Sequence, residues 1–168
     1  LVTNLNYKTH IFLHDLFLRY RPYFSNMEDI VEIIDGGTNP TGIYKWIKNY
    51  AAKNGRIEKI SEFNQIYIPN DENLITIILV DHQSLIRKES GLSTKKEAID
   101  KLSEYLQYAR DFYGFSPVLV AQMNRDIANP AYQKMDTFEP TPEQIKDSGT
   151  SFEDSDICMS LFDPVKFK

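Results

Sequence analysis

The feature that most constrains the fold is a long amphipathic segment flanked by two short apolar runs. The first run, Leu74–Asp81, is nearly all apolar and ends in a carboxylate, and the second, Pro117–Ala121, ends at Gln122. Between them, Thr94–Glu97 matches a capping box, and apolar residues then recur every three or four positions as far as Gly114. This pattern predicts strand–helix–strand, with two parallel strands that are buried on both faces.

Other segments extend this alternation. Asn39 as N-cap and Pro40 at the first position predict a helix that runs to about Asn54 and is ended by Gly55. Its expected apolar face consists of Ile43, Ile47, Tyr50 and Ala51. Gln65–Pro69 is expected to be a short strand. The chain is therefore predicted to be one α/β domain.

The remaining segments are less regular. Tyr7–Tyr20 has the apolar pattern of a mostly buried helix, whereas Ile30–Ile34 fits either a short helix or a strand. The polar stretch Asn124–Thr141 is expected to be a long loop, a length that is often functional. A short helix is expected from Thr141, and Ile157–Phe162 is the last expected strand.

Composition narrows the class of protein. The formal charge is −5, which does not favour a nucleic-acid binder as a whole, although binding depends on local patches. Cys158 is the single cysteine, so an internal disulfide and a cysteine-based zinc site are excluded. The run Ile75–Val80 is too short to cross a bilayer and no signal peptide opens the sequence. We therefore expect a soluble cytoplasmic domain.

Polar residues follow the predicted strands. Asp81 ends the first apolar run and Gln122 the second, and ligands of parallel sheets bind at the carboxyl ends of the strands. The turn Asp35–Gly37 is a third polar segment of this kind. Nucleoside triphosphatases use such a strand-end aspartate to hold Mg²⁺, usually through water. Taken alone, a strand-end aspartate such as Asp81 is more often a helix cap or a solvated strand end than a magnesium ligand.

Three segments together resemble the DnaB-like replicative helicases. Val80–Ile86 (VDHQSLI) resembles their Walker B segment, and Val120–Arg125 (VAQMNR) resembles their Ser-Gln-Leu-Asn-Arg motif. After the long loop, Pro142–Gly149 resembles Asp-Leu-Arg-Glu-Ser-Gly, and Glu153–Asp156 resembles Gln-Asp-Ala-Asp. The three matches occur in the family's order and spacing, and the best match covers residues 75–163.

The resemblance implies a RecA-like fold of the P-loop NTPase type, with a mostly parallel sheet, helices on both faces, and a sheet incomplete at both ends. Residues 1–168 would then form a single partial RecA-like ATPase domain. The implied activity is ATP hydrolysis coupled to translocation on single-stranded DNA and duplex unwinding during DNA replication. The implied cofactors are ATP and Mg²⁺, and the implied assembly is a hexameric ring in the cytoplasm of a bacterial cell, with a phage gene as one origin.

The resemblance also implies residue roles. Asp81 would orient the magnesium bound to ATP, through water, and Gln122 would sense the γ-phosphate. Arg125 would face the central channel. Lys146, Asp147 and Gly149 match family positions that contact the backbone of single-stranded DNA, a kind of contact that needs no base recognition.

The ATP site departs from the family pattern. No G-x-x-x-x-G-K-[ST] segment is present, because Val2 and Tyr7 stand where the glycines before Lys8-Thr9 should be. Glu28 is better explained as a helix cap than as the catalytic glutamate. We therefore expect the middle and later part of a motor domain, or a diverged copy, with little or no ATP turnover by this chain alone. The alternative is a catalytically inactive RecA-like module that binds DNA or serves as a scaffold.

Other chemistry-bearing residues have simpler explanations. His10 and His14 have helical metal-ligand spacing, but no third ligand accompanies them. His82 beside Asp81 is expected to make a structural hydrogen bond. The basic residues of the loop at 87–96 match a second DNA-facing loop of the family, although solvated surface charges explain them equally well.

Overall fold

The computed structural model describes residues 31–34, 39–123, 145 and 150–161. The chain divides into two compact units, Leu1–Gly36 and Gly37–Lys168. Of the first unit only residues 31–34 are described, and they are exposed and form neither a helix nor a strand. Both alternatives for Ile30–Ile34 are therefore wrong for these four residues. The predicted helix at Tyr7–Tyr20 lies outside the described residues, as do Asp35–Gly37, His10 and His14.

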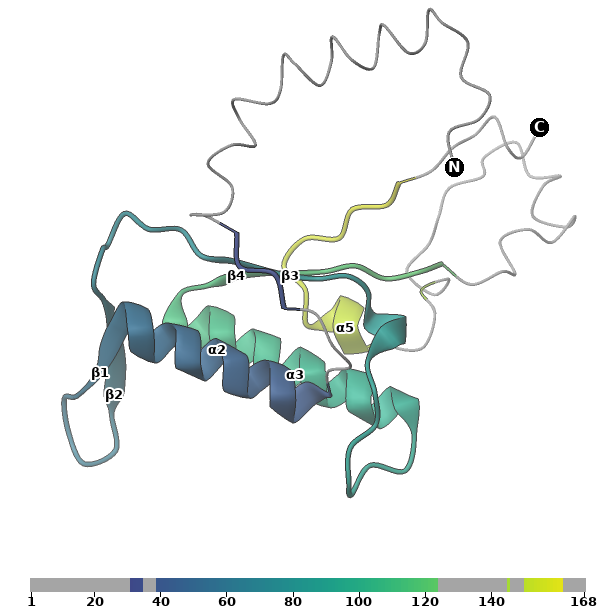
Figure 1. The fold of residues 1–168 in the computed structure, drawn as a ribbon, viewed down its shortest axis with the longest axis horizontal. Helices are drawn as coiled ribbons and strands as arrows, with labels where there is room; N and C mark the ends of the chain where they lie inside the picture. Colours follow the sequence, from purple (N-terminus) through teal and green to yellow (C-terminus); the bar gives the residue numbers. More distant parts are fainter. Residues whose placement is uncertain (1–30, 35–38, 124–144, 146–149, 162–168) are drawn as a thin grey trace, which may run out of the picture. The chain divides into compact units, whose positions relative to one another are not determined.

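The second unit is built on the strand–helix–strand motif that the sequence predicts (Figure 1). Strand β3 (Ile77–Val80) leads through α3 (Lys95–Tyr113) to β4 (Ser116–Leu119). The strands are parallel and pair from Ile77↔Ser116 to Val80↔Leu119. Both ends of α3 follow from its sequence, because the Thr94 side chain accepts a hydrogen bond from Glu97 N and Gly114 ends the helix at a φ of 71°.

Helix α2 (Pro40–Asn54) packs beside α3, and an antiparallel hairpin follows it. The Asn39 side chain accepts a hydrogen bond from Gly42 N at 2.7 Å, so the predicted cap is confirmed. The hairpin pairs β1 (Gly55–Lys59) with β2 (Gln65–Pro69). The sequence analysis predicts β2 but misses β1, which is a mostly exposed strand with three charged residues.

Helix α2 ends before Gly55, as predicted. Gly55 itself lies in extended backbone, with a φ of −177°. A Cβ atom at this position would lie 2.4 Å from the Tyr67 hydroxyl oxygen and 2.6 Å from the carbonyl oxygen of Ile68. Glycine is therefore required by the close approach of β2 rather than by its own dihedral angles.

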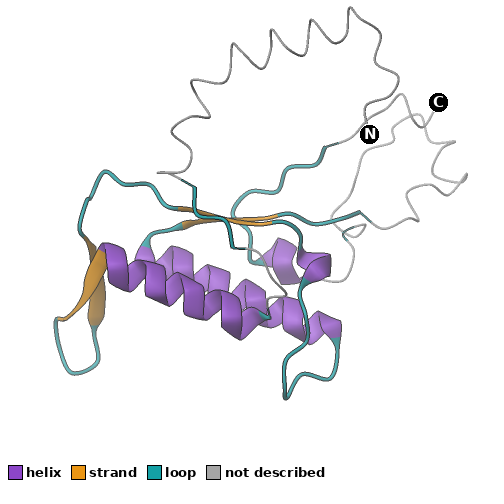
Figure 2. Cartoon of the chain, in the orientation of Figure 1, coloured by secondary structure: helices purple, strands orange, loops and turns teal. Residues whose placement is uncertain are grey.

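The sheets are smaller than predicted. Among the described residues there are two separate two-stranded sheets, β1–β2 and β3–β4, in place of one mostly parallel sheet. Helices α2 and α3 lie on the same side of β3–β4 (Figure 2). On the opposite face, Ile77 and Leu79 are 65% and 64% exposed. The prediction of helices on both faces, with strands buried on both, is wrong for the described residues, because successive side chains point to opposite faces and these helices cover only one.

The core lies between α2, α3 and the inner face of β3–β4. Its most buried aliphatic side chains on α3 are Ala98, Ile99, Leu102 and Ala109, all 0% exposed. Ile47 and Ala51 of α2 are buried, and Ile43 and Tyr50 pack against the same cluster. The predicted apolar face of α2 is therefore confirmed.

The last described element is α5 (Thr150–Glu153). Residues 157–161 are exposed and form no strand, so the predicted strand Ile157–Phe162 is wrong over its described part. The expected short helix from Thr141 lies outside the described residues. No helix in the described ranges is long and apolar enough to span a membrane.

Candidate functional site

The two polar strand ends lie at one edge of the parallel sheet. β3 ends at Val80 and β4 ends at Leu119, its register partner. Beyond the strands the backbones remain paired, since Val120 N donates to Val80 O at 3.0 Å and Gln83 N donates to Val120 O at 2.9 Å. Asp81 and Gln122 therefore follow the same edge of the sheet, and both side chains are exposed to solvent. We call this edge the carboxyl edge.

The turn after Asp81 is fixed by local hydrogen bonds. His82 caps the short 3₁₀ helix η2 (Gln83–Leu85), and its Nδ1 accepts from Ser84 N at 3.3 Å. The structural hydrogen bond expected of His82 is therefore confirmed. Gln83, the first residue of η2, is fully buried. The peptide bond between Asp81 and His82 is cis.

The predicted DNA-contact residues Arg125, Lys146, Asp147 and Gly149 lie outside the described residues. Their described neighbours are at the carboxyl edge. Ile145 forms an antiparallel bridge with Met123, the residue after Gln122. Met123 before the predicted loop Asn124–Thr141 and Ile145 after it therefore pair at the carboxyl edge.

A polar network joins α5 to α3. The Asp154 carboxylate accepts hydrogen bonds from Ser103 Oγ at 2.6 Å and from Gln107 Nε2 at 3.3 Å. Arg110 donates to the backbone oxygen of Asp154 at 3.1 Å and pairs with Asp156 at 2.9 Å. Sequence analysis recognised the two aspartates only as part of a family motif. In the structure they hold the segment that follows Gly149 against α3.

A second link starts at η2. Ser151 of α5 donates from its hydroxyl group to Oε1 of the buried Gln83 at 3.3 Å. Together with the bond from Gln83 N to Val120 O, this connects α5 to the ends of both parallel strands. The sequence carries no signal for Gln83, because it stands where the family's Walker B segment has a leucine.

Glu89 is another residue that the sequence analysis missed. Its carboxylate accepts from Thr41 N at 3.1 Å and from Thr41 Oγ1 at 2.9 Å, and it pairs with Lys101. The Lys101 hydrogen bond lowers the pKa of Glu89 below its usual 4.5. Glu89 therefore fastens the loop after β3 to the first turn of α2 and to α3.

Part of the basic loop serves this same local structure. Lys95 donates to the carbonyl oxygen of Ser84, and Lys88 donates to that of Ser93 at 3.3 Å. All four cations, Arg87, Lys88, Lys95 and Lys96, are exposed. Their arrangement fits surface charges that also brace the loop.

The carboxyl edge fits magnesium better than it fits a whole nucleotide. Mg²⁺ keeps several waters and commonly takes one or two carboxylates together with phosphate oxygens, so a solvent-facing Asp81 suits a water-mediated contact. No cluster of three or more potential protein ligands occurs among the described residues. The described loops also contain no glycine-rich cradle for a triphosphate.

Comparison with known proteins supports the fold. No protein-family model matches the chain, and no curated protein sequence matches it. The structure is similar to that of a DnaB-like replicative helicase that was described together with its interactions with primase. The TM-score is 0.50 at 14% sequence identity, and the similarity covers 74% of this chain but 25% of the helicase. The chain therefore has a mixed α/β fold, compatible with a RecA-like fold, that resembles about a quarter of that helicase.

Proposed function

We propose that this chain is part of an ATP-dependent replicative DNA helicase of the DnaB-like type. The observation that carries the proposal is the parallel pairing of β3 with β4, which brings Asp81 and Gln122 to one edge of the sheet. The order of the three motifs and the helicase-like fold support the same assignment.

In this proposal the two edge residues act on the nucleotide. Asp81 orients the magnesium ion through water, and Gln122 senses the γ-phosphate. Gln122 is two residues from Val120, and the carbonyl oxygen of Val120 accepts a hydrogen bond from Gln83 N in the turn after Asp81. A shift of either strand end therefore displaces the other. This connection offers a route from the nucleotide to the loop that begins after Met123.

The DNA contacts are assigned to the segment between Met123 and Thr150. Arg125 faces the central channel, while Lys146, Asp147 and Gly149 bind the phosphate backbone of single-stranded DNA. The intact protein is a hexameric ring in the cytoplasm. Because a backbone contact reads no sequence, the affinity for single strands is expected to fall with salt but to vary little with base composition.

DNA binding by this chain tests the proposal directly. We expect fluorescence anisotropy to show binding of dT and mixed-sequence oligonucleotides with similar affinity. Lys146→Ala should weaken both equally and reduce the slope of log K against log salt by about 0.7, the value for one phosphate contact on a single strand. Lys59→Ala, on the exposed β1, is the matched control and should change neither quantity. Equal affinities of wild type and K146A would contradict the assignment.

ATP hydrolysis by the isolated chain is expected to be at background, because the phosphate cradle is missing from the sequence. A radiolabelled ATPase assay with and without single-stranded DNA measures this. Robust turnover that DNA stimulates would show that the chain holds a complete site and that this part of the account is wrong.

The second candidate is a catalytically inactive RecA-like module that binds DNA or a partner protein. The absence of a G-x-x-x-x-G-K-[ST] segment favours it. The natural reading frame on either side of these residues distinguishes the two. A phosphate-loop strand encoded upstream and an arginine-bearing strand downstream would support the helicase. A natural reading frame that starts near Leu1 and stops near Lys168 would support the inactive module.

A further inference from the structure

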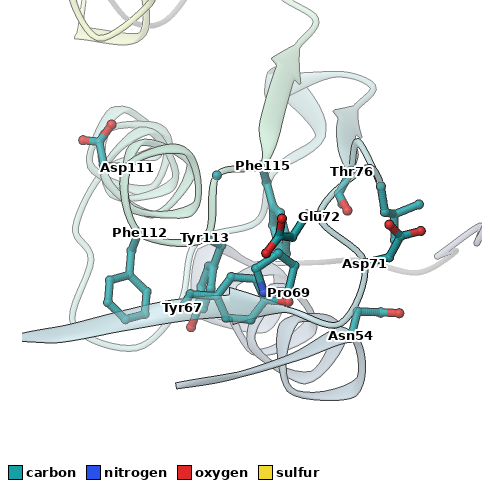
Figure 3. A pocket seen from close by; sticks show the side chains of 12 residues that line it. Asn54, Tyr67, Pro69, Asp71, Glu72, Thr76, Asp111, Phe112, Tyr113 and Phe115 are labelled. Carbon is teal, nitrogen blue, oxygen red and sulfur yellow. The ribbon is translucent and has the colours of Figure 1, made fainter. Parts of the chain in front are cut away.

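A cavity of about 390 Å³ lies at the opposite end of the β3–β4 pair, where the strands begin (Figure 3). It is bordered by Thr76 before β3, by Phe115 before β4, by β2 and by the last turn of α3. Ser116 N donates to Thr76 O at 2.8 Å and holds the two strand starts together. We call this end of the sheet the amino edge. Nothing in the proposed helicase function uses it.

Aromatic rings form the inner side of the cavity. Tyr67 meets Tyr113 edge-to-face with the ring centres 5.1 Å apart, and Tyr113 stacks on Phe115 at 5.4 Å. The Tyr67 hydroxyl donates to the carbonyl oxygen of Ala51 at 3.1 Å, which fixes its ring. Burial raises the pKa of Tyr113 to about 12 and also raises that of Tyr67, so both phenols are neutral at physiological pH. The cavity is therefore lined by neutral aromatic rings that their mutual contacts hold in place.

The charged residues that line the cavity in the described part of the chain are all acidic. They are Asp71, Glu72 and Asp111, with no lysine, arginine or histidine among the described lining residues. Asp111 pairs with Arg110 at 2.7 Å, and in Figure 3 its carboxylate points away from the ring cluster. The Glu72 side chain is exposed and forms no hydrogen bond or ion pair with any other described residue.

The helix adds to this field. The carboxyl end of the 19-residue α3 points into the same region, because its last residues Asp111, Phe112 and Tyr113 line the cavity. A helix carries a partial negative charge at this end, which favours a cation. The acidic side chains and the helix end thus both favour a positive charge in the cavity.

We propose that the amino-edge cavity binds an organic cation through its ammonium or guanidinium group. Such a group is attracted both by carboxylates and by the faces of aromatic rings, whereas a small hydrated metal ion gains little from the rings. The volume lies in the range of pockets that hold small molecules, so an arginine side chain or a short polyamine fits. The positive charge is balanced chiefly by Glu72.

The cation has two possible sources, a free polyamine or an arginine or lysine side chain of another protein. Both share the same chemistry, so the experiment uses spermidine as one probe and N-acetyl-arginine amide as the other. The neutral analogue N-acetyl-citrulline amide has the shape of the arginine probe but not its charge. Backbone amide NMR signals of Thr76, Gly114 and Phe115 report on the cavity during each titration.

We expect at least one cationic probe to shift these three signals in a saturable way and the citrulline probe to leave them unchanged. Glu72→Gln should weaken binding by about three- to fivefold, the effect of one exposed ion pair. Glu62→Gln, a matched exposed carboxylate in the β1–β2 loop, should leave the affinity unchanged. A response to spermidine alone would identify a polyamine site, and a response to the arginine probe alone would identify a side-chain site.

Three results would overturn the proposal: no shift with either cation, equal shifts with the citrulline probe, or equal weakening by E72Q and E62Q. The comparison of the arginine and citrulline probes uses the wild-type chain, so it decides the matter even if a variant fails to fold. The outcome is independent of DNA binding, which is measured at the other edge of the sheet.

Discussion

The two edges of the β3–β4 sheet are built from the same strands but in contrasting ways. At the carboxyl edge, Asp81 and Gln122 are solvent-exposed polar side chains on turns that backbone hydrogen bonds hold in place. At the amino edge, packed rings surround a cavity that is charged by acidic residues alone. The polar side chains of the first edge are open to solvent, whereas the second edge is a preformed recess.

The contrast shows how differently the two edges are encoded. The carboxyl edge is encoded locally, because each polar residue directly follows an apolar run. The amino edge combines residues from β2, the end of α3 and the turn before β3, which are distant in the sequence.

The largest expected loss of stability comes from a substitution in the hydrophobic core, which lies between the two edges and supports both. Leu102 is 0% exposed, so Leu102→Ala should lower the free energy of unfolding by about 3 kcal/mol. Urea denaturation measures the change. Leu85→Ala removes the same atoms from a side chain that is 66% exposed, and it should cost less than about 0.5 kcal/mol. Similar losses in the two variants would contradict the assigned core.

A smaller effect should be confined to the amino edge. Gly55→Ala places a methyl group against Tyr67 and the backbone of Ile68, so we expect about 2 kcal/mol of destabilisation through displaced packing. Because Tyr67 lines the cavity, the amide signals of Thr76 and Gly114 should shift more than that of Gln122. Equal shifts at the two edges would show that they do not respond independently.

The hydrogen bond between Ser103 of α3 and Asp154 should contribute less to the free energy of unfolding. Ser103→Ala removes a buried hydroxyl that donates to Asp154 and should cost about 1 kcal/mol in urea denaturation. Because the Asp154 carboxylate accepts this bond as well as one from Gln107, Asp154→Ala should cost less in the absence of the Ser103 hydroxyl than in the wild type. Full additivity in this double-mutant cycle would contradict a direct interaction.

The pH dependence of stability tests the anchor of the loop after β3. The hydrogen bond from Lys101 lowers the pKa of Glu89 from 4.5 in the folded state, so Glu89 stabilises the fold above pH 4.5. This contribution is lost as the pH falls through the lowered value. The unfolding free energy of Glu89→Gln should therefore decline less steeply below pH 4.5 than that of wild type. Glu62→Gln should follow the wild-type curve, and a parallel curve for E89Q would contradict the anchor.

The smallest effect on stability is expected at the candidate site itself. Asp81 is exposed and accepts no hydrogen bond from another described residue, so Asp81→Asn should change the unfolding free energy by less than about 0.5 kcal/mol. A loss above 1 kcal/mol in urea denaturation would show that Asp81 serves the fold rather than a ligand.

Local signals account for what the sequence predicts well. The ends of α3 and α2 follow from Thr94, Gly114 and Asn39, which act within a few residues of their own positions. The strand ends at Asp81 and Gln122 follow from short apolar runs. Because parallel strands must align their carboxyl ends, the meeting of these two residues was also predictable.

Long-range pairing accounts for what the sequence does not predict. β1 is exposed and charged, and it is a strand only because β2 pairs with it. The exposure of Ile77 and Leu79 depends on which face α2 and α3 cover, and an apolar run does not indicate that. Glu89 contacts Thr41 across 48 positions, so no local pattern reveals it.

The most direct test of the central claim is to find which edge of the sheet single-stranded DNA contacts. Titration of the labelled chain with a dT oligonucleotide, followed by amide NMR, separates the edges. We predict shifts at Gln122, Met123, Ile145 and Thr150, and none at Glu72, Thr76 or Gly114, where the acidic cavity repels phosphate. Shifts centred on the amino edge, or no binding, would contradict the assignment of the carboxyl edge to a helicase-type motor.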